Sequence, residues 1–235
     1  MKKIIIIIPA FNEEKTIEKI LLAIDNCKND SYTFEVIVVD DGSTDNTLKI
    51  LSSISHLYSK LILQKSNQGK GAAVKKGMLK ASGDYILFQD ADLEYDPADY
   101  SKLLSMVSKF DADLVIGSRL IAPEYTRVYY FWHKVGNKLI TLIFNLLNNT
   151  TFTDIYSCYL LFKRNLLDLN QVKSTGWEQQ AEILSLLVAS SKSMFEVPIK
   201  YNGRTYGEGK KIRAHHTIFV IWMIIKKFFI IKLKR

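Results

Sequence analysis

Five short apolar runs divide the first half of the chain, and none of them alternates with polar residues. Strands with one solvated face alternate, whereas strands covered on both faces read as continuous Val, Ile and Leu. The pattern therefore predicts buried strands of the kind found in a parallel sheet. These runs are residues 3–8, 34–39, 61–63, 85–88 and 114–116.

The segments between these runs are longer and helix-like. Pro97 suits the first turn of the last of them, after Asp96 as its cap. Strands that alternate with helices predict an α/β fold with an open, mostly parallel central sheet, right-handed crossovers and flanking helices. The predicted helices are residues 13–26, 44–56, 70–81 and 97–109.

This alternation breaks after residue 120. Residues 128–148 are predicted as an apolar helix or helix pair, with basic points at Arg127, Lys134 and Lys138. The remaining elements are a strand over 153–162, a helix over 176–189, a strand over 194–201, a Gly/Lys/Arg loop and a final helix over 214–235.

The composition fits one large domain, or one domain with an appendage. Of the 235 residues, 48% are apolar, which is ample for a buried core. Cys27 and Cys158 lack CxxC or Cys/His spacing, so we expect neither a disulfide framework nor a zinc site, and a reducing cytosolic setting fits better. The apolar start of the chain is too short for a signal peptide. No uncharged apolar stretch approaches about 18 residues, so no membrane span is predicted.

The net charge of +8 is unevenly distributed. Residues 199–235 hold ten Lys or Arg against one acid, Glu208, and account for +9, whereas residues 1–198 sum to −1. The basic character therefore belongs to the end of the chain. Because that end is apolar and carries no recognised binding motif, nucleic acid is not an expected partner.

The stretch 214–235 combines Ile, Phe and Trp with lysines. It suits an interfacial helix attracted to anionic lipid, and a helix docked onto the sheet with solvated basic ends is the alternative. We expect membrane association, which predicts a peripheral location on the cytoplasmic face of the membrane and leaves room for a membrane partner protein. Trp177 and Trp222 are interpreted as packing or membrane-edge residues.

Carboxylates gather where two of the predicted strands end. Asp40 and Asp41 follow the second strand, in "VVDDGSTDNT", and Asp90 and Asp92 follow the fourth, in "LFQDADLEYDP". Taken alone, the first motif could be a turn with a helix cap and the second a solvated loop. In an open α/β sheet, however, these strand ends converge at the ligand-binding rim. A divalent cation would offset their repulsion, and Mg²⁺ or Mn²⁺ bound with a diphosphate suits oxygen ligands at this spacing.

Four motifs, in order and spacing, resemble the family 2 glycosyltransferases with the GT-A fold. They are "IIIPAFNEEKTI", "VIVVDDGSTDNT", "NQGKGAAVKKG" and "DYILFQDADLEYDP". The later "GSR", "DIYSCYLLFKR", "GWEQQAEIL" and "VPIKYNGRTYGEGKKIR" resemble the dolichyl- and polyprenyl-phosphate sugar synthases. The resemblance implies a GT-A domain over 1–213, with a nucleotide-binding half at 1–119 and an acceptor half at 120–213, followed by the tail at 214–235.

The resemblance also implies roles for individual residues. Asp92 would be the direct metal ligand, with Glu94 as a second ligand and Asp90 near both the metal and the nucleotide. Arg204 and Lys210 would close over the diphosphate. Pro9, Phe11, Glu13, Asp40, Asp41 and Asp90 would line the nucleotide-sugar pocket. Lys70 follows Gly69 in a turn that is either purely structural or brings this lysine to the nucleotide.

The expected reaction is inverting transfer of a hexose from a UDP-glucose or GDP-mannose type of donor to a polyprenyl phosphate. A lipid phosphate is already an oxyanion, and Arg119, Arg127 and Lys134 are the candidates to bind it. A hydroxyl acceptor on a glycan or lipid would need a base, for which Asp154 and Glu178 are the candidates. The non-enzyme alternative is a nucleotide-sugar-binding partner subunit.

Overall fold

The computed structural model is described here for all residues except 29, 123, 126, 128–130, 209–215 and 234–235. Its centre is a seven-stranded sheet in the order β3-β2-β1-β4-β6-β5-β7. The strands are β1 Lys2–Ala10, β2 Tyr32–Asp40, β3 Lys60–Leu63, β4 Tyr85–Phe88, β5 Leu114–Ser118, β6 Leu160–Lys163 and β7 Met194–Pro198.

Strand β1 is an interior strand, third in the sheet order, and its isoleucines are covered from both sides. Residues 4–8 are all fully buried, and β1 pairs in parallel with both β2 and β4. The prediction of buried parallel strands is therefore confirmed for β1, β2 and β4, whereas the run at 61–63 forms the edge strand β3, in which Leu63 is 55% exposed. The parallel pairing places the carboxyl ends of β1, β2 and β4 along one rim of the sheet.

Strand β6 departs from the predicted pattern. It starts only at Leu160, so residues 153–159 of the predicted strand form a loop, and it runs antiparallel to both β4 and β5. The physical reason is that Asp154 and Ser157 are fully buried polar residues whose loop lies at the rim. The chain therefore enters β6 from the rim and runs back across the sheet.

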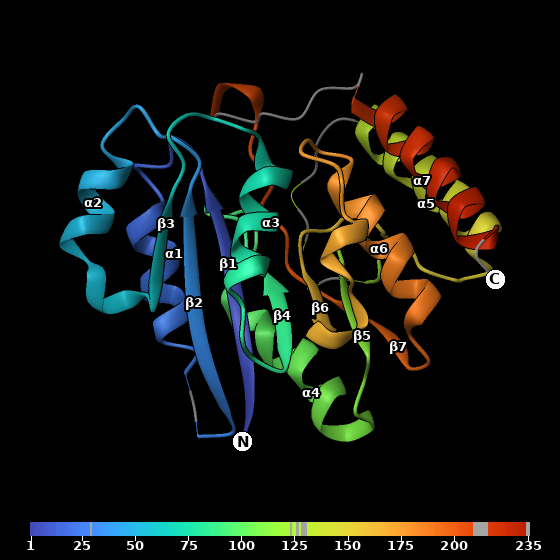
Figure 1. Cartoon of the computed structure of the whole chain (residues 1–235), viewed down its shortest axis with the longest axis horizontal. Helices are drawn as coiled ribbons and strands as arrows, with labels where there is room; N and C mark the ends of the chain where they lie inside the picture. Colours follow the sequence, from blue (N-terminus) through green and yellow to red (C-terminus); the bar gives the residue numbers. More distant parts are fainter. Residues whose placement is uncertain (29, 123, 126, 128–130, 209–215, 234–235) are drawn as a thin grey trace.

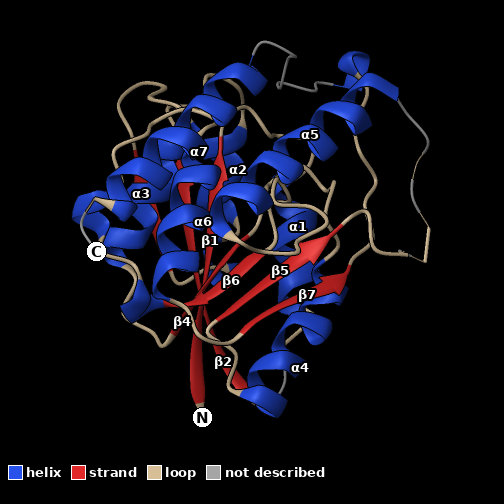
Figure 2. Cartoon of the chain, turned by 90° about the vertical axis from the view of Figure 1, so that its right-hand side faces the viewer, coloured by secondary structure: helices blue, strands red, loops and turns tan. Residues whose placement is uncertain are grey.

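The helices form two layers on the sheet and a further layer outside. Helices α3 and α6 cover one face and α1 and α4 the other (Figure 2). The close approach of Gly77 in α3 to Ile7 and Val39, and the edge-on contact of Phe34 with Tyr100, fix these faces. The helices are α1 Ile17–Asp25, α2 Thr47–Ser53, α3 Lys70–Lys80, α4 Tyr100–Phe110, α5 Phe131–Asn148, α6 Gln179–Ser190 and α7 His216–Lys232.

Helices α1 and α2 are shorter in the structure than in the sequence pattern. Helix α1 begins at Ile17, because the Glu13 carbonyl accepts from the backbone N–H groups of Thr16 and Ile17 in a turn. The 44–56 prediction becomes α2 and a separate 3-10 turn at Ser55–Leu57. The cap at Asp96 is confirmed, since its carboxylate accepts from the Ala98 backbone N–H at 3.0 Å, ahead of the 3-10 turn Pro97–Asp99.

Helices α5 and α7 lie side by side at the edge of the molecule (Figure 1). Helix α7 also packs against α6, where Lys227 forms a buried ion pair with Glu182 at 2.7 Å. The final helix is thus docked on the fold, as one of the two interpretations of the tail expected. In the part of the chain that the structure describes, every helix is too short or too polar to cross a lipid bilayer.

The position of β1 predicts the cost of truncating it. Replacing Ile6, which is fully buried, by Ala leaves a cavity and should destabilise the protein by about 2–5 kcal/mol. The control is Leu79→Ala on α3, where the side chain is 60% exposed and the expected change is within about 0.5 kcal/mol. Urea unfolding measures both changes, and equal losses would contradict the central position of β1.

Candidate functional site

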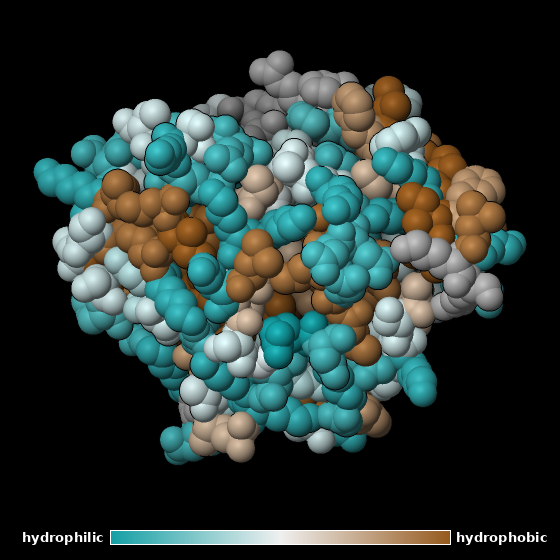
Figure 3. All heavy atoms as spheres, viewed as in Figure 1, coloured by the Kyte–Doolittle hydropathy of each residue, from teal (hydrophilic) through white to brown (hydrophobic). Residues whose placement is uncertain are grey.

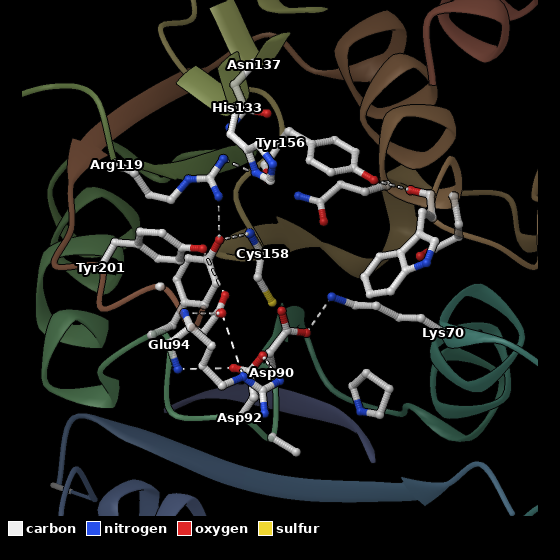
Figure 4. A pocket seen from close by; sticks show the side chains of 18 of the residues that line it. Lys70, Asp90, Asp92, Glu94, Arg119, His133, Asn137, Tyr156, Cys158 and Tyr201 are labelled. Carbon is white, nitrogen blue, oxygen red and sulfur yellow. Dashed lines mark hydrogen bonds and ion pairs between the residues drawn. The ribbon is translucent and has the colours of Figure 1, made fainter. Parts of the chain in front are cut away.

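A cavity of about 770 Å³ opens at the carboxyl ends of the parallel strands (Figure 4). Its walls come from every part of the chain: the β1 and β4 ends, the start of α3, the loop after β5, α5, the loop before α6 and the segment after β7. This is where an open α/β sheet binds its ligands. The sequence-predicted residues that line it are Pro9, Phe11, Glu13, Asp41, Lys70, Asp90, Asp92, Glu94, Arg119, Arg127, Lys134 and Arg204.

The carboxylates at the β4 end are held in place by a buried amide. Gln89 accepts hydrogen bonds from the hydroxyls of Tyr100 and Tyr159 at 2.7 and 2.8 Å and donates to the Asp90 carbonyl at 3.0 Å. Two residues further on, the Asp92 carboxylate accepts from the Glu94 backbone N–H at 3.1 Å. The loop after β4 is therefore fixed and turns its carboxylates into the cavity.

The chain supplies its own counter-ions to this cluster. Lys70 lies 2.5 Å from Asp90, and Arg204 lies 2.8 Å from Asp92 and 3.2 Å from Glu13. Even so, burial, together with the neighbouring Asp90 and Glu94 carboxylates, raises the pKa of Asp92 to about 7, against the opposing effect of Arg204. Two cations thus face four carboxylates, those of Glu13, Asp90, Asp92 and Glu94.

Glu94 has a different task from its two aspartate neighbours. One oxygen accepts from the Tyr201 hydroxyl at 2.9 Å and the other from the Arg204 backbone N–H at 2.7 Å. Glu94 therefore fastens the segment after β7 to the loop after β4, and this places the Arg204 guanidinium over the cluster. Its predicted part as a second metal ligand stays a prediction.

The aspartates fit a divalent cation that is completed by a ligand. The described residues contain no group of three or more His, Cys, Asp or Glu side chains arranged to hold a metal by themselves. Asp90 and Asp92 supply two carboxylates at one rim, which is the usual protein share of an Mg²⁺ or Mn²⁺ site whose other ligands are phosphate oxygens and water. The donor set therefore suits a metal that arrives with a diphosphate.

The two aspartates at the end of β2 lie in different places. Asp41 lines the cavity and accepts from the Gln64 side chain at 2.5 Å and from the Gln68 and Gly69 backbone at 2.8 and 3.0 Å. Burial raises the pKa of the Asp41 carboxyl against these hydrogen bonds. Asp40 is buried behind it and does not line the cavity.

The turn before α3 proves to be both structural and directed at the site. Gly69 has φ +93°, and a Cβ there would come within 2.6 Å of the Thr175 carbonyl oxygen, so only glycine fits. The next residue, Lys70, points into the cavity, where its Nζ lies 5.5 Å from the centroid of the Trp177 ring (Figure 4). The turn thus places the Lys70 ammonium group beside Asp90.

At the other end of the cavity, Arg119 is held rigidly. Its guanidinium binds both oxygens of Asp154, at 2.6 and 2.9 Å, and also donates to the Tyr95 hydroxyl and the Tyr156 carbonyl. It lies 5.0 Å from the centroid of the Tyr201 ring. Arg119 therefore presents a pre-oriented guanidinium to the cavity.

The two candidate bases lie elsewhere. Asp154 is fully buried beneath Arg119 and does not line the cavity. Glu178 stands at the start of α6, accepts from the Gly176 backbone N–H at 3.4 Å and does not line it either. Of the predicted cations, Arg127 forms an ion pair with Glu208 at 3.1 Å, and Lys210 falls outside the described residues.

Several lining residues were not predicted as site residues. His133, Asn137 and Lys138 flank Lys134 on one face of α5, and their i, i+4 and i+5 spacing was a usable signal. Trp177, interpreted as a packing or membrane-edge residue, instead lines the cavity beside Lys70. The other missed residues, among them Tyr156, Cys158 and Tyr201, are brought in by loops that no periodic pattern marks.

Comparison with known proteins places this site in a family. Residues 5–169 match the family model Glycosyl transferase family 2. The UDP-N-acetylglucosamine–dolichyl-phosphate N-acetylglucosaminyltransferase of Methanococcus voltae is 30% identical over 246 residues, covering 96% of both chains. The dolichol-phosphate mannosyltransferase of Pyrococcus furiosus is 28% identical, over 88% of this chain and 59% of that one. A low-salt glycan biosynthesis hexosyltransferase of Haloferax volcanii is 30% identical over 85% of this chain, which spans about half (48%) of its length.

Solved structures share the architecture at lower identity. Glucosyl-3-phosphoglycerate synthase from Mycobacterium tuberculosis, crystallised with Mn²⁺, UDP and glucosyl-3-phosphoglycerate, superposes with a TM-score of 0.70 at 20% identity, covering 97% of this chain and 80% of that one. This likeness concerns the fold. Together with the family match over most of the chain, it shows that the protein is a glycosyltransferase of the GT-A fold and belongs to glycosyl transferase family 2.

Proposed function

We propose that the protein transfers a hexose from a nucleoside diphosphate sugar to a polyprenyl phosphate of the dolichyl type, at the surface of a membrane and with a divalent cation. The bond between the anomeric carbon and the diphosphate oxygen would break as an oxygen of the lipid phosphate attacks from the opposite side. The nucleoside diphosphate leaves, and the configuration inverts, as the family resemblance implies. The dolichyl-phosphate relatives support the choice of acceptor.

The observation that carries this proposal is the two-sided character of α5. His133, Lys134, Asn137 and Lys138 line the same cavity as Asp92. The opposite side of the helix is exposed and apolar, through Trp132, Val135, Leu139, Leu142 and Leu146. A phosphate carried by a membrane lipid would meet cations at the cavity mouth while its chain stays in an apolar phase.

Helix α7 extends the apolar side of α5 into one surface. Its exposed apolar residues gather with those of α5 at one end of the molecule, at the upper right of Figure 3. They are Ile218, Phe219, Trp222, Ile225 and Phe229. Contiguous apolar patches on a protein surface mark contacts with a membrane or another protein. This surface, here called the α5–α7 face, supports a peripheral location on a membrane.

On the donor side, Asp90 and Asp92 would hold the Mg²⁺ or Mn²⁺ ion. The cation, when bound, acts as a Lewis acid on the diphosphate. Arg204 and Lys70 add fixed positive charge next to these carboxylates, where charge develops on the leaving group. Pro9, Phe11 and Asp41 line the part of the cavity assigned to the nucleoside.

On the acceptor side, the cavity offers cations that suit a phosphate. A phosphate monoester has its second pKa near about 6, so it is an oxyanion at neutral pH and needs no deprotonation. Arg119 is already oriented by Asp154, and Lys134 and Lys138 lie on the cavity wall. Because neither Asp154 nor Glu178 lines the cavity, a hydroxyl acceptor is the less favoured alternative.

The central experiment compares acceptors of equal chain length. Purified protein with Mn²⁺ and each of UDP-glucose, UDP-N-acetylglucosamine and GDP-mannose is incubated with polyprenyl phosphate or with polyprenol in vesicles. We expect glycolipid from the phosphate only, with one donor preferred. Transfer to polyprenol alone would support the hydroxyl alternative, and nucleotide release with neither lipid would leave a different acceptor to be found.

A second prediction concerns nucleotide and metal together. A ligand that binds only the native state stabilises it by about 2.7 kcal/mol at a concentration of 100 Kd. We expect UDP or GDP to raise the melting temperature more in the presence of Mn²⁺ than in its absence, because the diphosphate completes the ligand set of Asp90 and Asp92. CMP, which lacks a second phosphate, is the matched control. Equal shifts with and without Mn²⁺ would contradict the metal site.

The raised pKa of Asp92 yields a third prediction, for Asp92→Asn. In the wild type this carboxyl is protonated in the folded state up to pH about 7, so its contribution to stability is largest at low pH and falls as the pH rises from about 4 toward 7. Without metal, the variant should therefore gain stability relative to the wild type over this range, by up to about 4 kcal/mol. Turnover should fall by about 100-fold or more.

The comparison for Asp92→Asn is Asp25→Asn, which removes a carboxylate of α1 paired with Lys28 far from the cavity. It should leave turnover unchanged. Chemical denaturation across the pH range, without metal, measures the stability difference. Unfolding of Asp92→Asn at pH 7 would mean that the cluster is structural rather than a metal site.

The α5–α7 face predicts how the protein binds vesicles. Phe229→Glu places a charge where a 57% exposed ring would enter the lipid, and should lower partitioning onto anionic vesicles by about tenfold or more. Leu22→Glu, at a 45% exposed position of α1 on the other side of the sheet, is the control and should bind as the wild type. Cosedimentation with vesicles measures both, and equal binding would exclude this face as the contact.

A further inference from the structure

Lys227 is unusual among the lysines of α7 because it is buried. It is 5% exposed, whereas its neighbour Lys226 is exposed. Its Nζ lies 2.7 Å from a Glu182 oxygen and 2.8 Å from the Gln171 carbonyl oxygen. Val220, Met223 and Ile224 already give α7 an apolar contact surface. Burying an ion pair carries a large desolvation penalty that apolar packing does not. Docking of the helix alone therefore does not explain this pair.

The second oxygen of Glu182 binds the loop before α6. It accepts from the backbone N–H groups of Lys173 and Ser174, at 3.0 and 2.8 Å. Burial raises the pKa of Glu182, but the hydrogen bonds from Lys227 and Ser174 outweigh it and the net pKa is lowered. Glu182 is therefore an anion that ties α7, through Lys227, to the backbone of residues 171–174.

The other side of this segment contacts α3 and the turn before it. The Val172 carbonyl accepts from Lys75 of α3 at 2.5 Å, and the Thr175 carbonyl accepts from the Ala72 backbone N–H at 3.2 Å. Thr175 also lies against Gly69 and Gly71, the glycines on either side of Lys70. A shift of residues 171–175 would thus move the turn that delivers Lys70 to Asp90.

Trp177 completes the connection. Its indole ring lies 5.5 Å from the Lys70 Nζ and lines the cavity, and its carbonyl accepts from the Tyr156 hydroxyl at 2.9 Å. The first residue of α7, His216, meets the same ring edge-on at 6.1 Å between centroids. Helix α7 therefore contacts residues 171–177 in two places. His216 meets Trp177 directly. Lys227 binds Gln171 directly, and through Glu182 it is linked to Lys173 and Ser174.

We propose that Lys227 and Glu182 are positioning residues for sugar transfer. Their ion pair couples the position of α7 to the position of residues 171–177, and so fixes where Trp177 and Lys70 lie beside Asp90. Neither side chain touches substrate. The consequence is that the helix forming part of the α5–α7 face also shapes the catalytic cavity. The kinetic part of this inference rests on the proposed function, whereas its structural part does not.

The chain offers a clean spectroscopic test, because it has only three tryptophans. Trp132 and Trp222 are exposed by 76% and 55%, so both can be replaced by Phe to leave Trp177 as the single emitter. In this background, Lys227→Met should shift the Trp177 emission to longer wavelength and increase its quenching by acrylamide. The matched control is Lys226→Met, one residue away on the exposed side, which should leave both unchanged.

The kinetic readout separates positioning from bulk stability. A displacement of about 1 Å at the wall costs up to about 100-fold in rate, so kcat/KM for the nucleotide sugar should fall by about 10- to 100-fold in Lys227→Met, measured well below its melting temperature. A lower melting temperature with unchanged Trp177 emission and unchanged kcat/KM would overturn the proposal, since the pair would then be merely structural.

A second variant covers the case in which Lys227→Met fails to fold because Glu182 is left as an unpaired buried charge. Glu182→Gln combined with Lys227→Met carries no such charge, and the Gln side-chain oxygen still accepts from Lys173 and Ser174. The link from α7 is cut all the same, so the emission of Trp177 should shift. An unshifted emission in this folded double variant would sink the proposal, and it would do so whether or not any polyprenyl phosphate proves to be an acceptor.

Discussion

Repulsion among the carboxylates after β4 is the constraint on which the rim of this protein depends. Asp90, Asp92 and Glu94 stand within five residues of one another at the end of a buried strand. Their counter-ions are Lys70 and Arg204, two cations that are distant from them in sequence. Two cations do not balance the three carboxylates, so a further positive charge would stabilise the cluster.

The elements around the cluster can be understood from the need to hold those cations. The glycine turn before α3 fixes Lys70, and Glu94 fixes the segment that carries Arg204. Arg119 is fixed in the same manner by Asp154 beneath it. In each case an anion or a close backbone contact holds the cation in a single orientation. Such preorganisation is what electrostatic catalysis of group transfer requires.

Much of this could be predicted from residue patterns. Continuous apolar runs identified the parallel strands, and motif order identified the family and the rim residues Asp41, Asp90 and Asp92. The pattern failed where polar residues are buried for local reasons. Residues 153–159 look like a strand but form a loop that brings Asp154 to Arg119. Trp177 was misread for a related reason: an isolated aromatic residue in a loop gives no sign of its neighbours.

The α/β class, the central strands and the carboxylates of the rim follow from local patterns, because they depend on periodicity and on motifs contained in short segments. The packing of the chain was needed to show that Asp154 binds Arg119, that α5 turns its cations to the cavity and its apolar side outward, and that Lys227 pairs with Glu182. Each of these depends on pairs of residues that are far apart in the chain. The packing of whole helices and strands decides which partner a buried charge binds, and no local sequence pattern shows that partner.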